Sequence, residues 1–101
     1  MPKMSERNIY LSIIIPGYNE EKRLPTALKV LDNYLQKQNY LSEVIIVSDG
    51  STDETKRVAE EFRWSTPRCR VFEYFPNKGK GAAVKLGMLE ARGDINLFMD
   101  A

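Results

Sequence analysis

The sequence of 101 residues contains no histidine and a single cysteine, Cys69. Without histidine, the chain lacks the residue needed for a Ser-His-Asp triad, a histidine zinc site or imidazole acid–base catalysis. One cysteine excludes an internal disulfide and any metal site built from several cysteines. Carboxylates, lysines, hydroxyls and backbone amides are therefore the groups left to carry chemistry.

Long apolar runs and an excess of one charge are also missing. The polar N-terminus, MPKMSERN, lacks the apolar core of a secretory signal, and no apolar stretch approaches the length of a membrane span. Lys and Arg total 15 against 14 Asp and Glu, a net charge of +1 that gives no electrostatic basis for nucleic-acid binding. We expect a soluble, cytoplasmic domain without a nucleic-acid partner, in which residues 1–9 are a polar extension.

The length corresponds to one small domain or to part of a larger one. The final residues, INLFMDA, have the composition of a buried strand, and no sequence follows them. We therefore expect the chain to be a portion of a longer domain. A strand left without its neighbours is a template for pairing, so we also expect a homo-oligomer formed through an exposed sheet edge.

Apolar runs alternate with helical patterns along the chain. We predict strands over residues 11–16, 43–48, 70–75 and 95–99, and helices over 24–37, from Ser51 onward, and over 82–91. Ser51 and Glu54 have the spacing of a capping box, which predicts Ser51 as the N-cap of the second helix. The β-α order requires a parallel sheet with helices on its faces and right-handed crossovers.

Sequence alone leaves the strand order open, and we adopt 3-2-1-4, a Rossmann-like α/β arrangement with helices on both faces. In open sheets of this kind, ligands bind beyond the carboxyl ends of the strands. The ends of the first, second and fourth strands then bring a small polar set to one rim, namely Tyr18, Asn19, Glu20, Asp49 and Asp100.

The residues at the first two strand ends have two interpretations each. Asp49 with its glycine and serine neighbours is either an ordinary strand-to-helix turn or an acceptor for a base N–H. Tyr18 either packs in a turn or stacks on a base. We assign a ligand contact to Glu20, and we assign Glu21 to the helix start, where the helix dipole favours an acid.

Two later segments also have two interpretations each. The loop over residues 77–82, with Lys80, is either a solvated basic turn or a phosphate cradle built from outward-pointing amides. It matches neither a Walker loop nor a dinucleotide fingerprint. Asp100 is either a loop residue or one acid of a divalent-cation site.

Four segments, in order, carry a resemblance that covers the chain from Tyr10 onward. They are IIIPGYNEEKRLP at 13–25, VIIVSDGSTDET at 44–55, NKGKGAAVKLGMLEARGD at 77–94 and FMDA at 98–101. Together they resemble the nucleotide-binding half of an inverting family 2 glycosyltransferase of GT-A fold. The most similar subgroup is the polyprenyl-phosphate sugar synthases, dolichyl-phosphate β-glucosyltransferases first and dolichyl-phosphate mannose synthases second.

The resemblance implies a nucleotide-sugar site. Asp49 would hold the base, Lys80 would help the diphosphate, and Asp100 would begin a D-A-D motif that binds Mg²⁺ or Mn²⁺. The residues implied to line the site are Pro16, Tyr18, Asn19, Glu20, Val47, Asp49, Lys80, Asp100 and Ala101. Ser48 departs from the pattern, because many relatives carry a further Asp there.

The implied reaction transfers a hexose, glucose from UDP-glucose, to a polyprenyl (dolichyl) phosphate with inversion. The second metal-motif acid, the catalytic base and the acceptor-binding half are absent, so we expect no turnover from this chain alone and a membrane-associated parent. Use of GDP-mannose is the first alternative. A non-catalytic nucleotide-binding module and a self-associating structural fragment remain the others.

Overall fold

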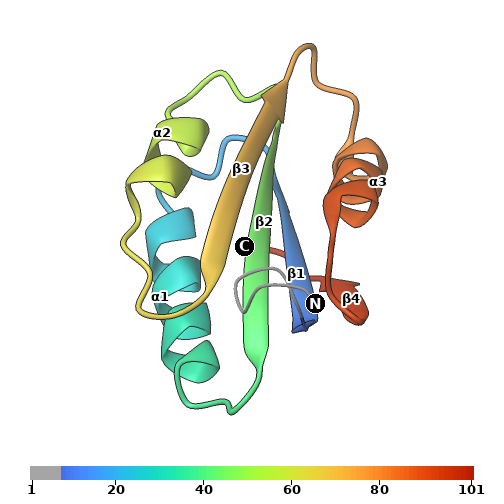
Figure 1. Cartoon of the computed structure of the whole chain (residues 1–101). Coiled ribbons are helices and arrows are strands. Elements are labelled where there is room, and N and C mark those ends of the chain that lie inside the picture. The colour runs from blue at the N-terminus through green and yellow to red at the C-terminus, as the bar shows by residue number, and fades with distance from the viewer. Residues whose placement is uncertain (1–7) are drawn as a thin grey trace.

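The computed structural model describes residues 8–101, so most of the predicted polar extension lies outside the described residues. Strands and helices alternate along the chain (Figure 1). Their bounds are β1 Ile9–Gly17, α1 Leu24–Leu35, β2 Leu41–Asp49, α2 Thr55–Glu61, β3 Arg68–Tyr74, α3 Lys80–Glu90 and β4 Ile95–Phe98. No helix within residues 8–101 is both long enough and apolar enough to span a bilayer.

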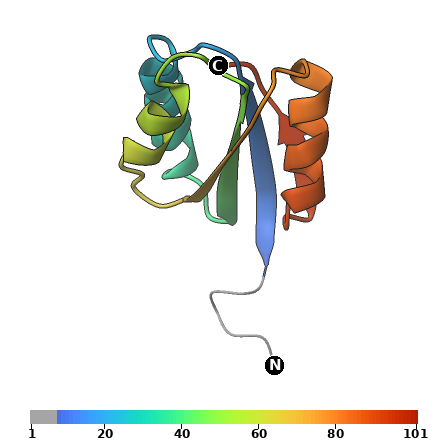
Figure 2. The ribbon, with the colours of Figure 1, turned by 90° about the horizontal axis from the view of Figure 1, so that it is seen from above.

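The four strands form one parallel sheet in the order β3-β2-β1-β4. Helices α1 and α2 cover one face of the sheet and α3 covers the other (Figure 2). The predicted order and the predicted helices on both faces are therefore confirmed. Because β1 pairs in parallel with both β2 and β4, the carboxyl ends of these three strands lie at the same edge.

The two central strands are buried on both faces, as their continuous β-branched runs predicted. One core forms between the sheet and α1, from residues such as Ile13, Ile15 and Leu28. A smaller core forms under α3, where Ile14, Ile45 and Val47 meet Ala83. Burial of these apolar side chains supplies the main driving force for folding.

Glycine at position 87 lets α3 approach the sheet closely. A Cβ on Gly87 would lie 2.7 Å from Ile14 Cγ1, so a larger residue would push the helix away from β1. This contact explains why a glycine, which costs about 1 kcal/mol relative to alanine inside a helix, stands within α3.

Two predicted features of the helices and strands were wrong. Helix α2 begins at Thr55, not near Ser51, because the Ser51 hydroxyl accepts a 3.1 Å hydrogen bond from the Asn19 amide. Asp53 binds the start of α2 instead, and its Oδ1 accepts from the Thr55 amide at 2.9 Å. The last strand is not buried: all four residues of β4 are exposed.

A buried glutamate fastens the end of α3 to the sheet. Glu43 is 2% exposed, and its Oε2 accepts hydrogen bonds from Ser12 Oγ at 2.6 Å and from the Arg92 amide at 2.7 Å. Its Oε1 pairs with Arg70 Nη2 at 3.0 Å, and the same nitrogen donates to the carbonyl of Glu90. Burial of the carboxyl would raise its pKa, but these bonds outweigh burial and lower the pKa of Glu43.

We predict that Glu43→Gln lowers the free energy of unfolding at pH 7 by about 1–3 kcal/mol, because the buried donors lose a charged acceptor. The lowered pKa of Glu43 stabilises the wild-type fold fully above the ordinary glutamate pKa of about 4.3. That stabilisation is lost as pH falls through the folded-state pKa. Urea unfolding at pH 7 and pH 3 therefore gives a smaller difference for the variant than for the wild type.

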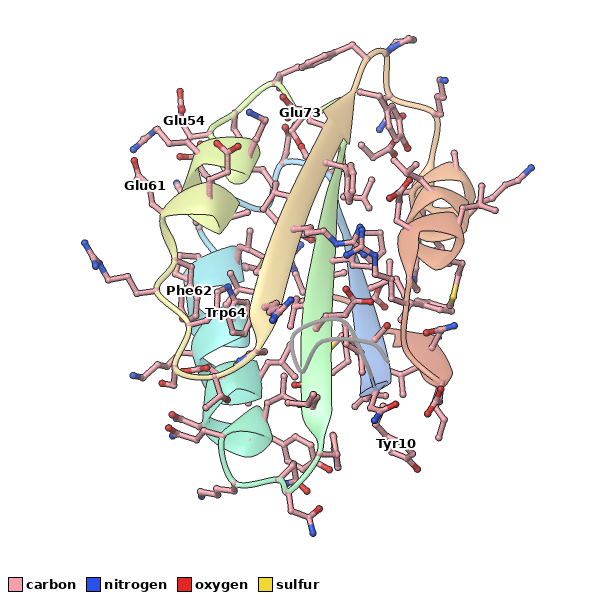
Figure 3. All side chains as sticks on the ribbon, in the orientation of Figure 1. Tyr10, Glu54, Glu61, Phe62, Trp64 and Glu73 are labelled. Atoms are coloured by element: carbon pink, nitrogen blue, oxygen red, sulfur yellow. The ribbon has the colours of Figure 1, made fainter. Side chains whose placement is uncertain are left out.

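The matched control is Glu61→Gln on α2, where the side chain is 64% exposed and points away from the sheet (Figure 3). This variant should unfold within about 0.5 kcal/mol of the wild type at both pH values. An equal pH dependence in the wild type and Glu43→Gln would contradict the assignment.

Candidate functional site

A cavity of about 180 Å³ opens at the edge of the sheet where the strands end. Residues from four separate parts of the chain line it: the end of β1 with the following loop, the end of β2, the start of α3 and the segment after β4. They are Pro16, Gly17, Tyr18, Glu20, Asp49, Lys80 and Asp100. The structure thus brings together most of the side chains that the sequence placed at one rim.

Three residues from the predicted site lie outside this cavity. Val47 is fully buried in the core under α3, because it alternates with Ile46 along a strand that is covered on both faces. Ala101 packs against the core on the α1 side. Asn19 lies beside the cavity, where its side chain holds two loops together.

Asn19 joins the loop after β1 to the loop after β2. Its backbone has a positive φ of 54°, which asparagine tolerates better than most residues. Its Oδ1 accepts from the amides of Thr52 at 2.8 Å and Asp53 at 3.3 Å, while its own amide donates to Ser51 Oγ. Asn19 is therefore a positioning residue in the structure.

Glu20 and Glu21 continue this junction. The Glu20 amide donates to Thr55 Oγ1 at 2.8 Å, and the Glu21 amide donates to Asp53 Oδ2 at 3.3 Å. The Glu20 carboxylate, which faces the cavity, accepts from Arg23 at 2.7 Å. The wall formed by the β1 loop is therefore held by backbone bonds, and one of its acids already has a cationic partner.

Ser48, the departure from the family pattern, is buried and donates to Glu73 Oε2 at 2.7 Å. Glu73 comes from the neighbouring strand β3, near its carboxyl end (Figure 3). The hydroxyl at position 48 thus contributes to the packing of β2 against β3 and does not line the cavity.

Asp49 is 3% exposed, and its carboxylate receives four hydrogen bonds from the end of β3 and the loop before α3. The donors are Tyr74 Oη at 2.6 Å, Asn77 Nδ2 at 2.9 Å, the Lys78 amide at 2.8 Å and the Gly79 amide at 2.9 Å. A carboxylate can accept about four hydrogen bonds, so these four donors occupy all the acceptor positions of Asp49. A base N–H would be accepted only in place of one of these donors.

The bonds to Asp49 also change the interpretation of the basic loop. The amides of Lys78 and Gly79 point inward to the carboxylate, so of the two interpretations of this loop, the phosphate cradle of outward-pointing amides does not hold at these two positions. Gly50 permits this approach. Its φ is 63°, and a Cβ there would lie 2.6 Å from Asn77 Cα.

Tyr74 was not among the predicted site residues. Burial and the hydrogen bond to the Asp49 carboxylate raise the pKa of Tyr74 to about 12, so its hydroxyl remains a donor at neutral pH. Its place at the end of β3, one strand over from Asp49, was the only signal in the sequence that could have identified it.

Lys80 and Asp100 close the cavity on the side of α3 and β4. Lys80 Nζ lies 2.7 Å from Asp100 Oδ1 and 5.2 Å from the centre of the Phe98 ring. The carboxylate predicted to bind a divalent cation thus pairs with an ammonium group. Among residues 8–101, no group of three or more His, Cys, Asp or Glu side chains is placed to hold a metal ion.

A larger cavity, of about 610 Å³, lies at the opposite end of the sheet, where Ile9, Leu35 and Leu41 contribute to its walls. Among the described residues that line it, Arg68 is the one that carries a charge, and the other polar ones, such as Gln36, Asn39 and Ser42, are neutral. Functional groups that converge on one point, and not volume alone, indicate a ligand site, and the smaller cavity gathers three carboxylates and one ammonium. The smaller cavity at the strand ends is therefore the stronger candidate.

Comparison with known proteins gives a consistent set of relatives. A model of the family described as "Glycosyl transferase family 2" matches residues 12–101. The dolichyl-phosphate beta-glucosyltransferase of Drosophila melanogaster is 45% identical over 101 residues, which cover 93% of this chain and 31% of that protein. The Mus musculus protein of the same name is 41% identical over 98 residues, covering 90% and 30%. This chain spans about 30% of the length of these curated relatives.

Solved structures are also similar to this chain. S. aureus TarS 1-349 matches with a TM-score of 0.78 and 31% identity, over 91% of this chain and 27% of that one. The complex of the same protein with UDP-GlcNAc matches with a TM-score of 0.70, over 91% and 26%. A mannosyltransferase from Pyrobaculum calidifontis, in complex with GDP-Man and Mn²⁺, gives a TM-score of 0.67 at 29% identity, over 93% and 28%.

We predict that Asp49→Asn releases the loop before α3. The amide side chain offers one acceptor oxygen in place of two charged ones, and bonds to a charged group contribute about 1.5–3 kcal/mol each. Hydrogen exchange of the Lys78 and Gly79 amides should accelerate by about tenfold or more, because their protection depends on this carboxylate.

The control variant is Asp94→Asn, which removes an exposed carboxylate on the loop between α3 and β4. Exchange of the two amides should be unchanged in this variant. Unchanged exchange in Asp49→Asn as well would show that Asp49 does not organise the loop.

Proposed function

The chain belongs to glycosyl transferase family 2, and from that premise we propose that it supplies the donor-nucleotide-binding part of a hexosyltransferase. The resemblance seen in the four sequence segments is confirmed at the level of the family and of its dolichyl-phosphate beta-glucosyltransferases. The GT-A-like fold agrees with the structural neighbours. The observation that carries the proposal is one cavity to which each of the four sequence segments contributes at least one side chain.

For the whole protein, we propose glucose transfer from UDP-glucose to a polyprenyl (dolichyl) phosphate. The names of the curated relatives reported above support glucose and dolichyl phosphate, and a neighbour bound to UDP-GlcNAc supports a UDP donor. The neighbour bound to GDP-Man keeps a GDP-mannose donor as the alternative.

The size of the cavity fits part of such a donor. Its volume of about 180 Å³ lies below the roughly 300–1,000 Å³ typical of small-molecule sites. We propose that the residues here contact the nucleotide. We also propose that a further part of the protein, matching the relatives' length beyond the 30–31% that this chain spans, supplies further walls, the catalytic base and the acceptor site.

The charges of the cavity favour a cation beside the diphosphate. Three carboxylates and one ammonium line it, so an anionic diphosphate would meet a lining of negative net charge. Asp100 is the most accessible of these acids, with a side chain 71% exposed, and a carboxylate oxygen is the ligand type that Mg²⁺ and Mn²⁺ prefer. The ammonium held by Asp100 indicates that this position favours a positive charge. A neighbour in complex with Mn²⁺ supports the same assignment.

In the proposed reaction, an acceptor phosphate oxygen forms a bond to the anomeric carbon as the bond to the nucleoside diphosphate breaks on the opposite face. A divalent cation, when bound, would neutralise the charge that develops on the leaving diphosphate. Lys80 would add a second positive charge at the same place. Tyr18, half exposed at the cavity wall, offers a ring face on which the base would stack.

We predict that UDP binds this chain in the presence of Mn²⁺, measured by calorimetry, and that NAD does not. Tyr18→Ala should weaken UDP binding about fivefold or more, because stacking of a base on an aromatic ring contributes about 1–3 kcal/mol. Asp100→Asn should remove the dependence of UDP affinity on Mn²⁺.

The matched control for the first variant is Tyr34→Ala on α1. Tyr34 is 54% exposed and Tyr18 is 49% exposed, but Tyr34 lies away from the cavity. Binding of NAD alone, or an equal loss of UDP affinity in the two tyrosine variants, would contradict the proposed site.

We also propose self-association of the chain through β4. Within residues 8–101 this strand lies at the edge of the sheet, and Ile95, Leu97 and Phe98 are 44%, 41% and 47% exposed. An apolar edge strand with unpaired backbone groups is a template for pairing with another chain. A second copy paired along this edge would continue the sheet and cover these side chains.

We predict a concentration-dependent dimer or larger species in sedimentation velocity, and a shift toward monomer in Leu97→Lys, since an edge lysine opposes strand pairing. Val30→Lys is the control, because Val30 is 65% exposed on helix α1 and belongs to no strand of the sheet. A strictly monomeric wild type at high concentration would exclude the proposal.

A further inference from the structure

We infer that Lys80 occupies the position on Asp100 that a divalent cation would take, and that a nucleoside diphosphate draws Lys80 away as the cation enters. The two ligands would then bind this chain cooperatively, with the cation weak alone and strong with the nucleotide. This inference rests on the proposed function, because it names the device by which the same cavity coordinates its two ligands.

The geometry places one cationic group directly on the acid. Lys80 Nζ lies 2.7 Å from Asp100 Oδ1, a full ion-pair contact, and both residues line the same cavity. The ammonium also lies 5.2 Å from the centre of the Phe98 ring, within the range of a cation–π contact. A metal ion approaching Asp100 therefore meets a positive charge already in place, and two like charges on one carboxylate repel.

The ion pair between Lys80 and Asp100 is weak enough for another cation to replace the lysine. The side chain of Lys80 is 53% exposed and that of Asp100 is 71% exposed, and ion pairs this accessible are weak because water screens them. Glu43 and Asp49 differ in this respect. Each is buried and accepts hydrogen bonds from several fixed donors, so freeing either carboxylate for a ligand would cost the fold several hydrogen bonds. Glu20 also has an exposed partner in Arg23, but the Glu20 side chain is only 15% exposed and accepts from two nitrogens of that guanidinium. Asp100 is therefore the most accessible acid of the cavity, and a single exposed ammonium is its partner.

Lys80 can move while its backbone stays fixed. It is the first residue of α3, directly after the loop that Asp49 holds through the Lys78 and Gly79 amides. Its long flexible stem carries a compact ammonium group that binds phosphate as a point charge. A diphosphate in the cavity would offer this group several anionic oxygens in exchange for one exposed carboxylate.

The exchange predicts reciprocal coupling. If the diphosphate removes Lys80 from Asp100, it raises the affinity of the cation, and the cation must raise the affinity of the nucleotide by the same factor. Without the lysine charge, the cation should bind more tightly alone and the coupling should be smaller. A lysine that merely attracts the diphosphate would have no such effect on the cation alone.

The test is binding of Mn²⁺ to the 101-residue chain, followed by the electron paramagnetic resonance signal of the free ion, with and without UDP. In the absence of UDP, Lys80→Gln should bind Mn²⁺ two- to fivefold more tightly than the wild type, in keeping with the small strength of an exposed pair. With UDP, the wild type should gain more affinity for Mn²⁺ than this variant does.

Two controls separate the charge from other effects. Lys85→Gln removes an exposed lysine from the same helix and should bind Mn²⁺ as the wild type does. Lys80→Arg keeps a cation at position 80 and should also resemble the wild type. Circular dichroism of each variant verifies that α3 remains folded.

The outcomes are distinct. Equal or weaker Mn²⁺ binding by Lys80→Gln in the absence of UDP, or no Mn²⁺ binding by either chain, would overturn the exchange while leaving UDP binding intact. Tighter Mn²⁺ binding by Lys80→Gln without any binding of UDP would support the competition at Asp100, but it would overturn both the displacement of Lys80 by a nucleotide and the proposed nucleotide site.

Discussion

The arrangement of the site depends on the hydrogen bonds that the carboxylate of Asp49 accepts. Asp49 ends a central strand, and its four hydrogen bonds fix the loop that leads into α3. Because that loop sets where α3 begins, it also sets where Lys80 stands relative to the end of β1. Gly50 makes the approach possible, since a side chain there would collide with the Asn77 backbone.

A second buried carboxylate performs the same task at the other end of α3. Glu43 binds the Arg92 amide just after the helix, and Arg70 connects Glu43 to the Glu90 carbonyl. Between these two anchors, Gly87 lets the middle of the helix lie directly on Ile14. Polar contacts at both ends, together with close packing in the middle, therefore place a helix that buries only Ala83 and Gly87 fully.

The strands and their order followed from local patterns, and so did the gathering of side chains at one edge of the sheet. Continuous β-branched runs predict central strands, and the carboxyl ends of parallel strands must share an edge. The partners of the polar groups did not follow. Ser51 has the spacing of a helix cap, but its hydroxyl is bound by an amide 32 positions away, and Asp49 is bound by residues 25–30 positions away. Such long-range bonds appear only once the chain has folded, so a local motif could not reveal them.

Burial decides which acids remain free for chemistry. In water a carboxylate can bind a ligand, but once buried it must be satisfied by fixed donors or it destabilises the fold. Glu43 and Asp49 are satisfied in this way. The same holds for Asp32, a buried residue of α1 that accepts hydrogen bonds from the Ser65 amide at 3.0 Å and the Ser65 hydroxyl at 2.8 Å. Each of the three carboxylates holds backbone or side chains from a distant segment. Asp100 is exposed and paired with one mobile lysine. The carboxylate group common to all four positions thus stabilises the fold where it is buried, and it is available for exchangeable binding where solvent and a flexible partner leave it accessible.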